Sequence, residues 1–259
     1  MKNSNLLSIL LELDLSLETN GGGTDKEFPK RYISLVYDRL LSNMQNLPIT
    51  IIEIGVRTGA SAKLFSSYFS VSNYYGVDNG TDVVWQNEDW LKGKNLKLIF
   101  ADAYNSEIFS LLPSKVDIII DDGPHSLISQ QWAALNYASI LKRNGFLFIE
   151  DIQGGIRFCD QIIRNRSKSF EGCIRIFDLR KISGQGDAII LMFHNCGNSC
   201  NLNIDNRNEL NFLNSLRRVT HSSAISYNLL RLRSRCKFKI LRITREIKPW
   251  WNRQFGKRG

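Results

Sequence analysis

Apolar and β-branched residues gather in short runs along the first 200 residues, and each run predicts a strand of one sheet. Within residues 116–120 only Asp117 is polar, and the run leads directly into Asp121 and Asp122. A strand covered on both faces loses the alternation of apolar and polar residues, so this pattern indicates a buried parallel strand. Similar runs predict further strands at residues 49–54, 73–78, 96–101, 146–151, 172–179 and 187–194.

Helical patterns lie between these strands. We expect helices at residues 6–17 and 29–41, after the turn at 55–61 through Phe69, and at 130–141, where residues 142–145 form a C-terminal stop. The last two strands are joined by a Gly-Gln-Gly turn and form a hairpin. The predicted fold is α/β, a doubly wound, mostly parallel seven-stranded sheet with one antiparallel strand, N-terminal helices and a basic C-terminal helix.

Charge divides the chain more sharply than hydropathy does. The chain carries a net charge of +9, and from Arg207 to the end there are fourteen Lys or Arg and two Glu. This tail therefore carries +12 and the other 206 residues −3. We expect three parts: an N-terminal helical cap with a Thr-Asp-Lys loop at residues 1–47, a core at 48–200, and a basic amphipathic extension at 201–259.

The extension predicts a helix with one apolar stripe, because Leu229, Leu232, Cys236 and Ile240 recur at three- and four-residue steps. Basic residues cover the rest, and two tryptophans follow. Residues 229–251 are thus typical of an interfacial helix on anionic lipid. The alternative is that the stripe packs on the core or on a second subunit in a homo-oligomer. Residues 231–245 also alternate partly as a strand does.

No apolar run approaches the roughly 20 residues that a bilayer span needs. The leucine-rich start is interrupted by Glu12 and Asp14 and has no small-residue cleavage site after it. The five cysteines are scattered and odd in number, which fits a reducing compartment better than a disulfide framework. We expect a cytoplasmic protein, in peripheral contact with the inner face of a membrane if the tail binds lipid.

The turn after the first strand predicts a nucleotide-binding site. Gly55 and Gly59 allow close approach of the backbone, and their spacing after Glu53 is E-x-G-x-x-x-G. It is not the dinucleotide pattern G-x-G-x-x-G, which argues against nicotinamide and flavin enzymes. Asp78 ends the next strand, where a carboxylate can accept hydrogen bonds from two ribose hydroxyls. Asp102 ends the third strand and is placed for an adenine amino group.

A second group of acids lies at the ends of two neighbouring strands. Asp122, Glu150 and Asp151 can converge on one divalent cation, Mg²⁺ or a similar hard ion. The alternative is that each acid caps a helix or accepts backbone N–H groups. His125 is then either the base that takes a proton near neutral pH or a turn residue. Asp121 supports the ligands or contacts the cofactor, and it can exchange these roles with Asp122.

The ordered set Glu53, Gly55, Gly59, Asp78 and Asp102 resembles the cofactor positions of the class I S-adenosylmethionine-dependent methyltransferases. Three local features resemble the macrolide and aminocoumarin sugar O-methyltransferases, the macrocin, mycinamicin and noviose enzymes: Thr24-Asp25-Lys26 followed by Tyr32 and Tyr37, residues 120–125 (IDDGPH) and residues 149–151 (IED). Pro124 and Glu27 depart from that pattern.

The resemblance implies a Mg²⁺-dependent O-methyltransferase that uses S-adenosylmethionine on a sugar hydroxyl of a glycan or glycosylated metabolite. It implies cofactor-binding roles for Thr24, Lys26 and Tyr32. Two alternatives stay open. One is a nucleic-acid-binding or RNA-modifying protein that uses the basic tail, against which the acidic core and the lack of a lysine-centred tetrad argue. The other is a metal-site protein of the cephalosporin-hydroxylase type.

Overall fold

The computed structural model describes residues 5–16, 23–69, 72–81 and 95–197. The predicted basic extension at 201–259, including the expected helix at 229–251, lies outside the described residues. Within the described part of the chain, no helix is long and apolar enough to cross a bilayer.

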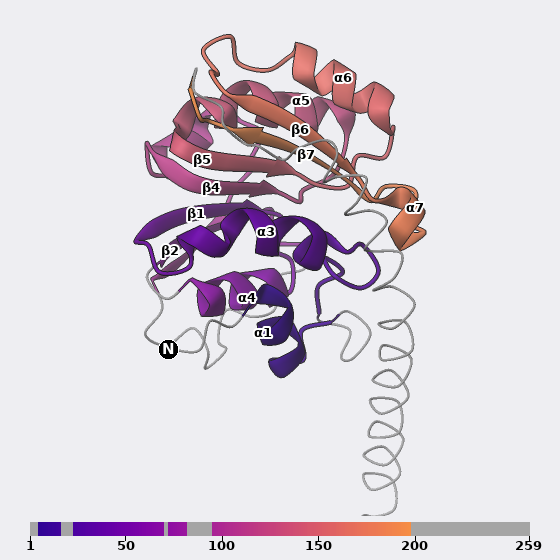
Figure 1. Ribbon diagram of the computed structural model, residues 1–259. Helices are drawn as coiled ribbons and strands as arrows, with labels where there is room; N and C mark the ends of the chain where they lie inside the picture. Colours follow the sequence, from indigo (N-terminus) through magenta and orange to yellow (C-terminus); the bar gives the residue numbers. More distant parts are fainter. Residues whose placement is uncertain (1–4, 17–22, 70–71, 82–94, 198–259) are drawn as a thin grey trace, which may run out of the picture. The chain divides into compact units, whose positions relative to one another are not determined.

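One seven-stranded sheet forms the centre of the fold (Figure 1). Its strand order is β3-β2-β1-β4-β5-β7-β6. Strand β7 runs antiparallel to both of its neighbours, and the other pairings are parallel. The predicted doubly wound, mostly parallel sheet with one antiparallel strand is therefore confirmed. The strands are β1 Ile49–Ile54, β2 Ser72–Asp78, β3 Leu96–Phe100, β4 Val116–Asp121, β5 Leu141–Ile149, β6 Cys173–Asp178 and β7 Ile189–His194.

Helices cover both faces of this sheet (Figure 1). One layer contains α1, η1, α3 and α4, and the other contains α5 and α6. The α-helices are α1 Leu6–Glu12, α3 Asp38–Leu41, α4 Ala60–Tyr68, α5 Leu127–Asn136, α6 Ile156–Arg164 and α7 Arg180–Ser183. The segment η1 Ile33–Tyr37 is a π-helix, and η2 Ser42–Met44, η4 Ser106–Ser110 and η5 Tyr137–Ile140 are 3₁₀ turns.

The expected helix at 130–141 ends earlier than predicted. It becomes a 3₁₀ turn after Asn136, and residues 142–145 belong to β5 instead of forming a helix stop. The reason is pairing with the chain that leaves β7, since the Asn144 N–H donates to the Asn195 carbonyl at 2.7 Å and the Asn195 N–H to the Gly145 carbonyl at 2.9 Å. These partners are distant in sequence, so the local pattern could not indicate them.

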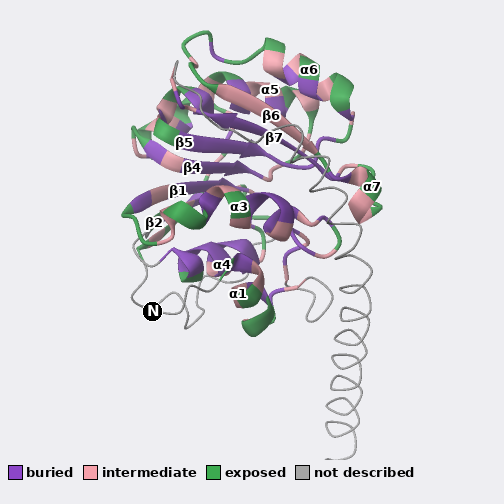
Figure 2. Cartoon of the chain, viewed as in Figure 1, coloured by how far each residue is buried: buried purple, intermediate pink, exposed green. Residues whose placement is uncertain are grey.

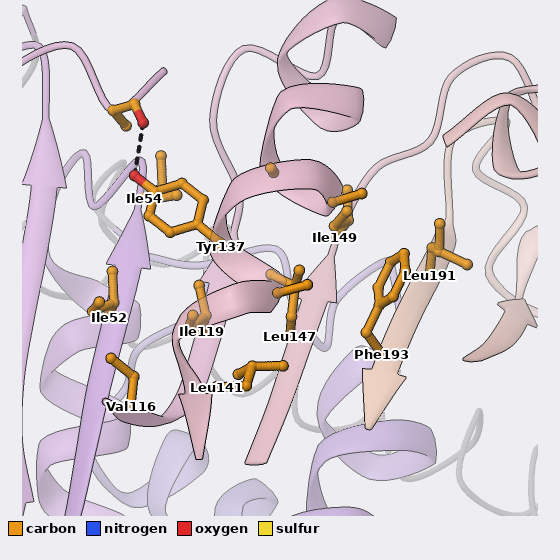
Figure 3. Packing of buried hydrophobic residues seen from close by; sticks show 14 of the residues in the cluster. Ile52, Ile54, Val116, Ile119, Tyr137, Leu141, Leu147, Ile149, Leu191 and Phe193 are labelled. Atoms are coloured by element: carbon orange, nitrogen blue, oxygen red, sulfur yellow. Dashed lines mark hydrogen bonds between the residues drawn. The ribbon is translucent and has the colours of Figure 1, made fainter. Parts of the chain in front are cut away.

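The face of the sheet toward α5 holds the main core. Figure 3 shows Ile52 of β1, Ile119 of β4, Leu147 of β5 and Phe193 of β7 in one buried cluster. Tyr137 lies among them, and its hydroxyl reaches the Ala103 carbonyl at 2.7 Å. A buried side chain of this size contributes about 1.5–3 kcal/mol, so the central strands are strongly held. Figure 2 shows β1, β4, β5 and β7 buried along most of their length.

The opposite face is covered by the layer of α1, η1, α3 and α4, called the N-terminal layer below. Tyr37 of η1 packs edge-on against Phe65 of α4 and Phe148 of β5, with ring centroids 5.5 and 4.9 Å apart. Side chains on a strand alternate between faces, so Glu53 and Glu150 meet this layer instead of solvent, and both are buried.

Among the described cysteines, Cys159 and Cys196 are free thiols. Cys173 is disulfide-bonded, a bond that the scattered cysteine spacing did not indicate.

Candidate functional site

A cavity of about 600 Å³ opens at the carboxyl ends of the parallel strands. Ligands bind at this edge in open α/β sheets because the connecting loops diverge there. The predicted site residues that line the cavity are Thr24, Gly55, Asp78, Asp102, Asp122, His125 and Asp151. The predicted residues that do not line it are Lys26, Tyr32, Glu53, Gly59, Asp121 and Glu150.

Gly55 lets two strand ends come together. It has φ +81°, and a Cβ atom there would lie 2.2 Å from the carbonyl oxygen of Asp122. Only glycine accepts both the left-handed backbone and this close approach. The turn after β1 and the end of β4 therefore form one continuous floor of the cavity.

Asp78 and Asp102 lie on the cavity wall at the ends of β2 and β3. The Asp78 carboxylate accepts the N–H groups of Arg57 at 3.0 Å and Gly80 at 2.8 Å. Asp102 accepts the Tyr104 N–H at 2.9 Å. These bonds fix each carboxylate, and each keeps capacity for a further donor because a carboxylate has about four acceptor positions.

Asp122, His125 and Asp151 converge at the cavity. Each offers a ligand atom, and these atoms lie within 4.8 Å of one another. The Nε2 atom of His125 is 3.8 Å from Oδ1 of Asp122 and 3.7 Å from Oδ2 of Asp151. Both His125 and Asp151 have positive φ, +55° and +56°. A left-handed backbone at two non-glycine residues costs free energy, so the surrounding contacts must hold it.

Glu150 occupies a different place from the one predicted for it. Its carboxylate accepts the ammonium of Lys26 at 2.6 Å and the hydroxyl of Tyr37. The side chain is 1% exposed and faces the N-terminal layer. The structure brings His125, in place of Glu150, next to Asp122 and Asp151.

Lys26 does not line the cavity. It lies inside an acidic cluster, formed by Glu53, Asp122, Glu150 and Asp151. It is fully buried, and its Nζ atom is 2.7 Å from Asp122 Oδ2, 2.6 Å from Glu150 Oε2 and 3.7 Å from Glu53 Oε1. Burial opposes its charge, but the carboxylates of Asp122 and Glu150 raise the pKa of Lys26 well above its ordinary value. Lys26 is therefore a permanent cation of this cluster.

Asp151 is held by two side chains of the same N-terminal segment. Lys30 donates to its Oδ2 atom, and the Tyr32 hydroxyl donates to Oδ1 at 2.8 Å. Tyr32 thus contacts a predicted metal ligand and does not line the cavity. Sequence reasoning missed Lys30, although it lies four residues after Lys26 in a segment already singled out.

Asp121 and Asp122 point to opposite faces of the sheet, as the strand pleat requires. Asp122 meets Lys26 and the cavity. Asp121 is 2% exposed and accepts the hydroxyl of Tyr104 at 2.5 Å, while its Oδ2 atom has no hydrogen-bond partner. Burial raises the pKa of Asp121 to about 7. No pattern in the sequence indicated Tyr104.

The sequence matches no family model and no curated protein. Comparison with solved structures finds MycE methyltransferase of the mycinamycin biosynthetic pathway, in complex with Mg and SAH, at 15% identity and a TM-score of 0.55, covering 76% of this chain and 56% of that one. The fold is the Rossmann-like methyltransferase fold. The chain spans 56% of the length of that MycE structure.

Other similar structures include the MycE complex with Mg, SAH and mycinamycin VI, at 19% identity and a TM-score of 0.47 over 61% of this chain and 40% of that one. The fibrillarin pre-rRNA processing protein of Methanococcus jannaschii is 15% identical, with a TM-score of 0.47 over 59% of this chain and 68% of that one.

Proposed function

We propose that this chain is an S-adenosylmethionine-dependent O-methyltransferase that binds Mg²⁺ or a similar divalent cation and methylates a sugar hydroxyl of a glycan or glycosylated metabolite. The observation that carries the proposal is the meeting of Asp122, His125 and Asp151 within 4.8 Å. They meet at the cavity that Asp78 and Asp102 also line.

The acidic wall suits a cationic cofactor. In this proposal Asp78 would hold the ribose hydroxyls, Asp102 would hold the adenine amino group, and Gly55 would allow the cofactor close to the backbone. A sulfonium is positively charged, and the fixed carboxylates favour it. MycE, which has the same fold, was solved with SAH.

The donor set also fits a divalent cation. A carboxylate oxygen of Asp122, one of Asp151 and a ring nitrogen of His125 lie within 4.8 Å of one another, and oxygen ligands suit Mg²⁺. The carboxyl groups of Glu53, Asp122, Glu150 and Asp151 outnumber the ammonium groups of Lys26 and Lys30, so a dication would meet an excess of acidic groups. When bound, such a cation lowers the pKa of an acceptor hydroxyl. Glu150 joins the ligands only if Lys26 releases its Oε2 atom.

His125 is the proposed acceptor of the proton. His125 lines the cavity, and its Nε2 atom is 3.8 Å from Asp122 and 3.7 Å from Asp151. The two carboxylates stabilise the imidazolium that forms when the acceptor hydroxyl loses its proton. The chain thereby contributes a base, and the strand ends align acceptor and methyl donor.

The test is methyl transfer from S-adenosylmethionine to a panel of sugars and glycosides, with Mg²⁺ and with chelator. We expect a methyl ether only when Mg²⁺ is present. The Asp122→Asn variant should lose activity, whereas Asp160→Asn, at an exposed position of α6, should keep it. An absence of heat on titration with S-adenosylmethionine would overturn the cofactor assignment. Activity in chelator would overturn the requirement for a cation and leave the cofactor assignment intact.

A further inference from the structure

Two lysines from one short segment carry their charges into the acidic cluster. Lys26 and Lys30 lie in the turn that precedes η1. Their side chains are 0% and 7% exposed. Full burial of an ammonium is unfavourable unless carboxylates surround it. Both lysines therefore serve the cluster and not the surface.

Lys26 bridges acidic side chains that come from three different strands or strand ends. Its Nζ atom lies 2.7 Å from Asp122 and 2.6 Å from Glu150, with Glu53 3.7 Å away. These acids come from β1, from the end of β4 and from the end of β5. A single ammonium thus holds together three like charges that would otherwise repel.

Lys30 likewise binds several acidic side chains. It binds Asp151 and lies 3.2 Å from Asp187, just before β7, and 3.5 Å from Asp25 of its own segment. Because Asp151 also accepts the Tyr32 hydroxyl, both of its oxygens are held by residues that precede η1. The segment that precedes η1 therefore holds Asp151 in position, and Asp151 in turn holds this segment in position.

We propose that Lys26 and Lys30 are resident cations of this site, which keep its carboxylates together and the fold intact when no divalent cation is bound. The inference rests on the proposed cation site. Removing one lysine leaves buried acids without compensation, and a divalent cation then becomes necessary for stability. The lysines also repel the cation, so the wild-type site holds it loosely and exchangeably.

The experiment measures the thermal unfolding midpoint, Tm, of the full chain in chelator and in excess Mg²⁺. The variants are Lys26→Met and Lys30→Met. The matched control is Lys142→Met. Lys142 lies at the amino end of β5, far along the sheet from the cavity edge, is 38% exposed and pairs with Asp117 of β4 at 2.7 Å. An ion pair whose ammonium is open to solvent contributes little, so the control should lose only a few degrees, equally in both buffers.

We expect the wild type to show nearly the same Tm in both buffers. Lys26→Met should lose about 10 °C in chelator, as breaking a buried ion pair does in a chain of this size. Mg²⁺ should restore most of this loss. Titration calorimetry should show Lys30→Met binding Mg²⁺ at least about tenfold more tightly, because a repelling charge is gone.

Equal losses in chelator and Mg²⁺ would overturn the proposal, as would a wild type that needs Mg²⁺ as much as the variants do. If Lys26→Met does not fold in either buffer, Lys26→Met/Glu150→Gln decides. Its Tm should return part of the way toward that of the wild type, since one of the three acidic groups around Lys26 is also removed, and no recovery would overturn the proposal. These readouts need no methyl transfer, so a protein that fails to bind S-adenosylmethionine would refute the proposed function separately.

Discussion

The hydroxyl of Tyr104 donates a hydrogen bond of 2.5 Å to Oδ1 of Asp121. Gly123 makes room for it, because a Cβ atom at that position would lie 2.1 Å from the Tyr104 oxygen. Tyr104 also lines the cavity. The bond therefore connects the ionisation of a buried acid to the wall of the proposed cofactor site.

We expect Tyr104→Phe to raise the pKa of Asp121 above its value of about 7, because the lost hydroxyl favoured the ionised form. An ionised Asp121 favours the cationic cofactor, so affinity for S-adenosylmethionine should fall about three- to tenfold at neutral pH. At a pH high enough to ionise Asp121 in both proteins, wild type and variant should bind alike. Titration calorimetry measures this, with Tyr75→Phe in β2 as control. Equal affinities at neutral pH would refute the link.

His125→Asn should lower the rate of methyl transfer by about 10² to 10⁴, the usual contribution of a general base. Its affinity for S-adenosylmethionine should stay within about twofold of wild type, because the imidazole contacts Asp122 and Asp151 and not the predicted ribose or adenine partners. The control is His194→Asn, since His194 stacks on Phe146 with ring centroids 4.4 Å apart. If His125→Asn is fully active, a group other than His125 accepts the proton.

Gly55→Ala and Gly184→Ala form a matched pair. Both glycines have left-handed backbones, φ +81° and +75°, but a Cβ atom at Gly184 meets nothing within 4 Å. Gly184→Ala should lower the free energy of unfolding by about 1–2 kcal/mol, through backbone strain alone. Gly55→Ala should cost more and weaken cofactor binding, because the Asp122 carbonyl must move. Urea unfolding and calorimetry test both effects, and equal costs would mean that the contact with Asp122 is unimportant.

Stability should depend on pH through Glu53. Burial raises its pKa from 4.5 to about 7, so between these values the folded chain binds this proton more tightly than the unfolded chain does. Wild-type stability should therefore fall, relative to Glu53→Gln, as the pH rises from 4.5 to about 7, and the difference should stay constant above that. Urea unfolding at several pH values measures it, with the exposed Glu107→Gln as control. Parallel pH profiles would contradict the prediction.

The strands and the edge where chemistry gathers were determined by the sequence itself. The apolar run at 49–54 became β1, and the run beginning at Val116 became β4, because burial of a strand on both faces depends on the strand's own residues. Asp78 and Asp122 follow such runs directly. Parallel strands end at one edge, so the grouping of these acids at one cavity followed from their positions in the chain.

Only the tertiary structure decided which side chain meets which. Lys26 binds Asp122 and Glu150, 96 and 124 residues away, and Lys30 reaches Asp187 across 157 residues. The pleat sends Asp121 to Tyr104 and Asp122 to Lys26. Such contacts depend on the directions of side chains from separate elements, and no local pattern records them. The same reason explains why Glu150, adjacent to Asp151 in sequence, faces the N-terminal layer while His125 completes the group at the cavity.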